Sequence, residues 1–249
     1  MDSATSWIAS LKAGSRGSPW LICFPYAGGG SAVFRSWPSL LQKETRLCAI
    51  RLPGRETRVK EPPFRSVEPL VKELADVLSQ MIDGRYVFFG HSMGALIAFV
   101  ISREFRRQGV PLPDVLIVAG AKAPHLPLPR PPKHDLPDPL FMDELRRLEG
   151  TPKEALEHPE LMELMMPMLR ADFALVETYR FEPEAPLACP IVAFGGKDDR
   201  EVSISDIEAW RLHTTSTFSH RVFPGGHFFL QEREAEVVAE VEKYLALGI

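Results

Sequence analysis

Short apolar runs alternate with longer amphipathic stretches along most of the chain. Each run is bounded by turn-forming residues, a pattern typical of buried strands. Six such runs recur: Trp20 to Phe24, Leu47 to Leu52, Tyr86 to Phe89, Val115 to Ala119, Ile191 to Phe194, and Arg221 to Phe223. Because helical patterns separate these runs, the sequence predicts an α/β fold whose mostly parallel central sheet carries helices on both faces.

Two of the intervening stretches predict particular helices. From Ser66 to Met81, apolar residues that include Leu70 and Leu74 recur at helical spacing, behind a serine that can cap the first turn. The stretch from Met93 to Phe105 is apolar almost all round at its start. We therefore expect this second helix to pack deep against the sheet.

One region interrupts the alternation. Between about Pro124 and Phe181 there is no convincing strand pattern, and a proline-rich stretch is followed by helical patterns with apolar faces. An insertion after a central strand of an open α/β sheet lies above the carboxyl edge of that sheet, where ligands bind. We expect a single domain over residues 1–249, with residues 124–181 forming a helical lid.

The predicted lid is rich in methionine. Five of the eight methionines of the chain fall inside it: Met142, Met162, Met165, Met166 and Met168. Because methionine adapts its shape, a methionine-rich helix would suit a channel that accepts ligands of different form. The alternative is that these side chains fill the internal packing of the lid. Pro167 lies among them and predicts a kink in the helix.

The composition is that of an ordinary globular protein. Hydrophobic residues make up 45% and charged residues 25%, and the net charge of −4 gives no basic footprint for nucleic acid. There is no apolar stretch of transmembrane length, and the N-terminus lacks a basic segment followed by an apolar one. We expect a cytoplasmic monomer with no nucleic-acid or membrane partner.

The cysteines favour a reducing compartment. Cys23, Cys48 and Cys189 each lie beside an apolar run, without metal-ligand spacing and without an even number for pairing. We expect three buried free thiols.

The strongest chemical signal is a nucleophile elbow. Gly90-His91-Ser92-Met93-Gly94 matches G-x-S-x-G, and the match lies between a predicted strand and a predicted helix, as the motif requires. Glycines are needed at both ends because the sharp turn brings backbones together, while the serine is held in a strained conformation that exposes its hydroxyl. The pattern predicts an α/β-hydrolase fold with Ser92 as nucleophile.

A serine hydroxyl needs a base within hydrogen-bonding distance. In this fold the order along the chain is Ser, Asp or Glu, then His, and His227 fits because it follows the last predicted strand on a Pro-Gly-Gly loop. His91 is excluded because its side chain leaves the elbow in another direction. The remaining histidines are expected to be surface or packing residues: His125, His134, His158, His213 and His220.

The acid should follow the preceding strand, where two aspartates stand side by side. Either Asp198 or Asp199 could orient the imidazole of His227. We favour Asp199, because it completes a G-x-x-D turn from Gly196 that carries the side chain past the strand end. Asp198 would then be a turn residue that caps the loop.

The tetrahedral intermediate needs two N–H donors. One is the amide of Met93, next to the nucleophile. The second is expected in the glycine-rich loop after the first long apolar run, and we assign it to Ala27. This loop lacks the Gly-Lys-Ser/Thr ending and the spacing of a nucleotide-binding loop.

Several motifs together resemble the type II thioesterases, the stand-alone editing enzymes of polyketide and non-ribosomal peptide synthesis. They are Phe24-Pro25-Tyr26-Ala27-Gly28-Gly29, Leu52-Pro53-Gly54-Arg55, Gly-His-Ser-Met-Gly, Arg170-Ala171-Asp172-Phe173, Gly-Gly-Lys-Asp-Asp with Trp210 downstream, and Pro-Gly-Gly-His-Phe-Phe-Leu. The resemblance extends from about Trp20 to Leu245.

The resemblance implies a triad of Ser92, Asp199 and His227, with Ala27 and Met93 as oxyanion donors and the insertion as lid. It implies thioester hydrolysis of acyl or aminoacyl groups on the phosphopantetheine arm of a carrier protein, without a metal or bound cofactor. A carboxylesterase of the same fold would use the same triad. A macrocyclising thioesterase domain would normally end a megasynthase, and a non-catalytic member of the fold would be expected to lose a triad residue.

Overall fold

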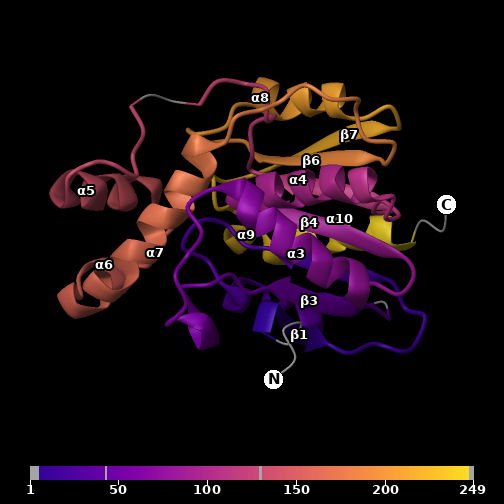
Figure 1. Ribbon diagram of the computed structural model, residues 1–249, viewed down its shortest axis with the longest axis horizontal. Helices are drawn as coiled ribbons and strands as arrows, with labels where there is room; N and C mark the ends of the chain where they lie inside the picture. The colour runs from indigo at the N-terminus through magenta and orange to yellow at the C-terminus, as the bar shows by residue number, and fades with distance from the viewer. Residues whose placement is uncertain (1–5, 43, 129–130, 247–249) are drawn as a thin grey trace.

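In the computed structural model, residues 6–42, 44–128 and 131–246 are described; Pro129 of the proline-rich stretch lies outside them. Within these ranges a seven-stranded sheet has the order β1-β3-β2-β4-β5-β6-β7 (Figure 1). Its strands are β1 (Ile8–Lys12), β2 (Trp20–Phe24), β3 (Arg46–Ile50), β4 (Tyr86–His91), β5 (Val115–Ala119), β6 (Ile191–Gly196) and β7 (Phe218–Phe223). The six predicted strands are confirmed, and they run parallel.

The edge strand β1 was not predicted. It pairs antiparallel with β3, with Ile8 opposite Ile50, and an irregularity interrupts the register between Ser10 and Lys12. An edge strand is paired on one side only, and its apolar residues alternate with polar ones. It therefore lacks the continuous apolar run of the central strands.

Alternate residues of each central strand enter different cores. In β4, Tyr86 and Phe88 pack on one face of the sheet, while Val87 and Phe89 pack on the other. Helices α3 (Val67–Met81) and α4 (Met93–Gln108) cover the first face. The second face is covered by α2 (Trp37–Leu40), α9 (Phe229–Glu232) and α10 (Glu234–Ala246). Both predicted helices are confirmed, and burial on both faces explains the near-continuous apolar strands.

Short helical turns complete the connections between strands. They are η1 (Ser31–Phe34), η2 (Glu56–Arg58), α8 (Ile204–Glu208) and η3 (Ala209–His213). The three cysteines are free and buried, as predicted. Burial raises the pKa of Cys48 to about 12, so this thiol stays protonated.

The region between β5 and β6 contains α5 (Asp138–Leu148), α6 (Lys153–Leu156) and α7 (Pro159–Thr178). In Figure 1, α5 and α6 stand to one side of the sheet, and α7 runs from them back toward it. Pro167 lies inside α7, which continues through it. We refer to α5, α6 and α7 as the lid.

The lid has a small core of its own. Phe141 and Leu145 of α5 pack against buried residues of α7, among them Met162, Met168 and Leu169. Met142, Met165 and Met166 are partly buried against this cluster. Helices that project from a domain need apolar side chains between them, and flexible methionine fills such irregular gaps.

Candidate active site

Ser92 lies at a sharp turn between β4 and α4. Its backbone has φ 53° and ψ −115°, a positive φ that side-chain-bearing residues rarely adopt. A Cβ on Gly94 would lie 2.1 Å from the carbonyl oxygen of Phe24, and one on Gly90 would lie 2.3 Å from the carbonyl oxygen of Gly94. The strained serine and the need for both glycines therefore have a direct steric cause.

The structure brings together the three residues predicted as a triad. His227 Nε2 lies 3.1 Å from Ser92 Oγ, and His227 Nδ1 lies 2.8 Å from Asp199 Oδ2. Asp199 follows β6 and His227 follows β7, so neighbouring parallel strands deliver both side chains to the same sheet edge. Of the two candidate aspartates, the side chain of Asp199 is 0% exposed against the imidazole, whereas Asp198 is exposed in the loop.

Both carboxylate oxygens of Asp199 are occupied. While Oδ2 faces His227, Oδ1 accepts hydrogen bonds from the backbone N–H groups of Glu201 and Val202, at 2.8 and 3.0 Å. A Cβ on Gly196 would lie 2.2 Å from the carbonyl oxygen of Gly226, so the loops after β6 and β7 are in close contact. The Asp199 carboxylate is thus fixed by backbone N–H groups of its own loop, and it in turn orients the imidazole of His227.

His91 supports the loop that carries His227. Its Nε2 lies 2.9 Å from the carbonyl oxygen of His227, and a carbonyl can only accept, so Nε2 carries the proton. Burial, followed by the proximity of His227, lowers the pKa of His91 to about 3. His91 is therefore neutral near pH 7 and is engaged with a backbone atom, in agreement with its exclusion as the base.

The two predicted oxyanion donors line the same cavity as the nucleophile. Met93 is the first residue of α4, where backbone N–H groups have no partner within the helix. Ala27 lies in a turn after β2 in which Gly29 N–H donates to Tyr26 O at 2.9 Å. The role of these two amides as oxyanion donors stays a prediction.

This cavity has a volume of about 620 Å³ and lies between the sheet edge and the lid. Apolar side chains from the sheet domain and the lid form much of its wall: Leu96, Leu126, Leu128, Leu145, Leu148, Phe173, Val176, Phe181 and Val202. The five lid methionines are absent from this wall. The prediction of a methionine-lined acyl channel is therefore wrong, because those side chains fill the contact between α5 and α7 instead.

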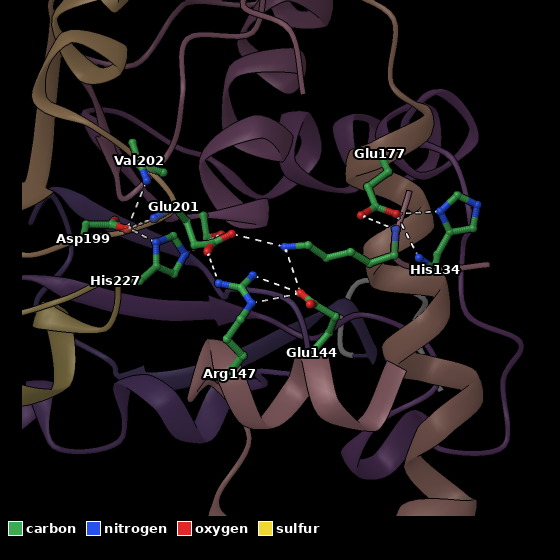
Figure 2. A network of polar contacts seen from close by, with 10 residues as sticks. His134, Glu144, Arg147, Glu177, Asp199, Glu201, Val202 and His227 are labelled. Atoms are coloured by element: carbon green, nitrogen blue, oxygen red, sulfur yellow. Dashed lines mark hydrogen bonds and ion pairs between the residues drawn. The ribbon is translucent and has the colours of Figure 1, made fainter. Parts of the chain in front are cut away.

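An ionic network that sequence reasoning missed joins the lid to the loop of Asp199 (Figure 2). The carboxylate of Glu201 forms ion pairs with Arg147 Nη1 of α5 at 2.6 Å and with Lys133 Nζ at 3.2 Å. Glu144 of α5 pairs with the same two cations, at 3.0 Å from Arg147 and 3.7 Å from Lys133. Partial burial opposes ionisation of Glu201, but Arg147 and Lys133 outweigh it and lower its pKa to about 2. The carboxylate is therefore charged at neutral pH.

We expect this network to contribute measurably to stability. In a double-mutant cycle with Arg147→Met and Glu201→Gln, the coupling in the free energy of unfolding should be about 0.5–1 kcal/mol at low salt. It should shrink at high salt, because ions screen partly exposed charges. Denaturant unfolding measures this. The Asp143–Arg146 pair of the same helix, with side chains 68% and 55% exposed, is the control and should show coupling near zero. Equal coupling in both pairs would contradict a special role for the network.

The described residues include no group of three or more His, Cys, Asp or Glu side chains placed to hold a metal ion. Within the same ranges no helix is long and apolar enough to cross a membrane.

Comparison with known proteins identifies the family. The model of the thioesterase domain matches residues 19–245. The gramicidin S biosynthesis protein GrsT of Aneurinibacillus migulanus is 39% identical over 247 residues, which cover 99% of this chain and 96% of that protein. Thioesterase PikA5 of Streptomyces venezuelae is 34% identical, over 96% of this chain and 85% of its own length.

A solved structure agrees in fold. The type II thioesterase BorB from the borrelidin biosynthetic cluster matches with a TM-score of 0.89 and 33% identity, covering 96% of this chain and 98% of that chain. The sheet, its covering helices and the elbow are those of the α/β-hydrolase fold that the sequence predicts. Because the family model spans nearly the whole chain and the relatives align over almost its full length, the chain belongs to the thioesterase family, among relatives that include type II thioesterases.

Proposed function

We propose that this protein hydrolyses acyl or aminoacyl thioesters carried on the phosphopantetheine arm of carrier proteins, as an editing enzyme of polyketide or non-ribosomal peptide synthesis. The observation that carries the proposal is the hydrogen-bonded chain from Asp199 through His227 to Ser92, which opens into a cavity with apolar walls. The family and the names of the relatives support the thioester as the bond that is cleaved.

The first half of the proposed reaction transfers the acyl group to the enzyme. His227 Nε2 accepts the proton of Ser92 Oγ as the oxygen attacks the thioester carbonyl. Asp199 stabilises the imidazolium, and the amides of Ala27 and Met93 receive the oxyanion. When the intermediate collapses, the carbon–sulfur bond breaks, and His227 gives its proton to the departing pantetheine thiolate.

The second half releases the product. A water molecule enters the place of the thiol, His227 removes one of its protons, and the resulting hydroxide attacks the acyl-serine carbonyl. Collapse of this second intermediate returns the proton to Ser92 Oγ and liberates the carboxylic acid. The two halves together consume one water molecule and yield one acid and one thiol.

The cavity wall supports an acyl chain of moderate size as the bound group. Besides its apolar part, the wall carries charged side chains near the lid, among them Lys122, Lys133, Glu177 and Glu201. Lys133 and Glu201 neutralise each other at 3.2 Å. Glu177 accepts from the backbone N–H groups of Lys133 and His134 and contacts His134 Nδ1 at 2.7 Å.

The function is tested by comparing two substrates with the same acyl group. An acyl carrier protein should be hydrolysed with a kcat/KM about tenfold or more above that of the acyl-N-acetylcysteamine thioester, because binding energy from the non-reacting part of a substrate can lower the barrier. Thiol release and intact-protein mass spectrometry measure the two rates.

The matched oxygen ester is the control for bond specificity. Faster cleavage of the oxygen ester than of either thioester would replace the proposal with a carboxylesterase. Equal rates on the carrier and on the N-acetylcysteamine thioester would remove the carrier protein from the proposal and leave thioester hydrolysis in place.

A further inference from the structure

The turn that carries the second oxyanion donor has a specific conformation. Gly29 N–H donates to Tyr26 O at 2.9 Å, and Gly28, the third residue of the four, has φ +81°. A positive φ at this position is the signature of a type II turn, in which the central peptide has one of two opposite orientations. Here that peptide joins Ala27 to Gly28. The proposed oxyanion donor, the N–H of Ala27, belongs to the preceding peptide, so a flip of the central peptide would disturb it through the changed backbone conformation of Ala27.

A lid carboxylate is hydrogen-bonded to this central peptide. Gly28 N–H donates to Asp172 Oδ2 of α7 at 2.7 Å. If the central peptide turned over, the carbonyl oxygen of Ala27 would face the carboxylate and the hydrogen bond would be lost. The same helix covers the turn one helical turn earlier, because a Cβ on Gly28 would lie 2.7 Å from Leu169 Cδ2.

Arg55, which follows β3, completes the arrangement. Its Nη1 donates to Asp172 Oδ2 at 2.9 Å and its Nη2 donates to Oδ1 at 2.6 Å, a bidentate pair. Nη1 also donates to the carbonyl oxygen of Gly29 at 2.7 Å. The pair thus contacts the turn at two points: Asp172 accepts from the N–H of Gly28, and Arg55 donates to the carbonyl oxygen of Gly29. The side chains of Arg55 and Asp172 are 6% and 2% exposed, so water does not compete strongly for these contacts.

The charges of the pair bear on the chemistry as well. A lone buried carboxylate close to the proposed oxyanion donor would destabilise the negative charge that develops on the substrate oxygen. The guanidinium of Arg55 neutralises the carboxylate of Asp172 while leaving it able to accept from Gly28. An acidic group can therefore hold the turn without opposing the reaction.

We propose that Asp172 and Arg55 are positioning residues that hold the Tyr26–Gly29 turn, and with it the amide of Ala27, in the orientation that stabilises the oxyanion. The proposal rests on the proposed thioester hydrolysis. It makes the oxyanion site depend on three separate elements: the loop after β2, the loop after β3, and the lid helix α7. The half of α7 that contains Asp172 is then part of the catalytic framework.

The main test uses Asp172→Asn. Asparagine keeps the size of the side chain but loses the bidentate ion pair, so the turn should be held less firmly. We expect kcat to fall by about 10- to 100-fold with KM within about twofold, because loss of an oxyanion donor acts on the transition state and not on ground-state binding. Hydrolysis of one acyl-N-acetylcysteamine thioester over a range of concentrations gives this separation.

The affinities of two ligands distinguish a positioning role from a general loss of stability. Octylboronic acid forms a tetrahedral adduct with a catalytic serine and should bind Asp172→Asn more weakly by about the same factor as kcat. Octyl-pantetheine thioether, which lacks the thioester carbonyl and so places no oxygen in the oxyanion site, should bind the variant and the wild type equally. Calorimetry measures both affinities.

Arg55→Lys is the second variant, and it keeps the positive charge beside Asp172 while removing the planar fork. It should show the same kcat effect at about tenfold, and it decides the matter if Asp172→Asn does not fold. Asp138→Asn is the matched control, since Asp138 is 76% exposed and pairs with Arg170 of the same lid helix. This control should keep the kcat and boronate affinity of the wild type.

The outcomes separate the two proposals. A folded Asp172→Asn or Arg55→Lys variant with unchanged kcat and boronate affinity would overturn the positioning role, provided that the wild type hydrolyses the thioester. An equal loss of affinity for boronate and thioether would also overturn it, since the damage would then be general. A wild type that neither hydrolyses the thioester nor binds the boronate would overturn the proposed function together with this inference.

Discussion

Replacement of Ser92 by alanine is expected to reduce thioester hydrolysis by about 10⁴-fold or more while leaving the fold intact. The hydroxyl of Ser92 is the group within hydrogen-bonding distance of His227 Nε2, at 3.1 Å, so its removal takes away the proposed nucleophile and not merely a binding contact. The substitution should also leave the packing of the core unchanged, because Ser92 faces the cavity. Release of free thiol from an acyl carrier protein measures the loss.

A covalent probe distinguishes loss of the nucleophile from general damage. A fluorophosphonate should add once to the wild type at Ser92 and not at all to Ser92→Ala, as intact mass shows. Ser79→Ala is the control, because Ser79 lies in α3 and its hydroxyl donates to the carbonyl oxygen of Asp76 in the same helix. It should retain labelling and rate. If Ser92→Ala kept a rate near that of the wild type, the serine mechanism would have to be abandoned.

Asp199→Asn should reduce the rate by about a thousandfold or more, whereas Asp198→Asn should cost less than tenfold. The carboxylate of Asp199 accepts from His227 Nδ1 at 2.8 Å, which leaves Nε2 free to take the serine proton. An asparagine amide that donates to Nδ1 would force the proton onto Nε2, and the imidazole could no longer act as base. Asp198 is exposed and contributes its backbone N–H to Gly225 O at 2.9 Å, which asparagine preserves.

Single-turnover acylation followed by quench and mass spectrometry reports the step concerned. Slow acylation in Asp199→Asn, with a normal thermal unfolding midpoint, is the expected result. The opposite pattern, with Asp198→Asn severely impaired and Asp199→Asn nearly normal, would transfer the orienting role to Asp198.

The sheet could be predicted from the sequence because its central strands are buried on both faces. Val115–Ala119, for example, is apolar at every position and buried throughout. The edge strand Ile8–Lys12 contains exposed Ser10 and partly exposed Lys12, so its pattern does not differ from that of a loop. What makes it a strand is pairing with β3, roughly 40 residues later in the chain.

The methionines of the lid show a different limit. A methionine-rich helix can line a channel or fill a core, and the sequence pattern is the same in both cases. The choice depends on where α5 lies relative to α7. In the structure Phe141 and Leu145 of α5 meet Met162 and Met168 of α7, so the methionines are used in the lid's own packing.

By itself the sequence determined the nucleophile elbow at Ser92, because this strained turn is local and depends on five consecutive residues, Gly90 to Gly94. The tertiary structure decided which distant groups meet. It placed His227 against Ser92, 135 residues away along the chain, and Arg55 against Asp172, 117 residues away. Such contacts follow from the packing of whole helices and strands, which sets distances within a few tenths of an ångström, whereas sequence patterns specify only which face of an element is buried.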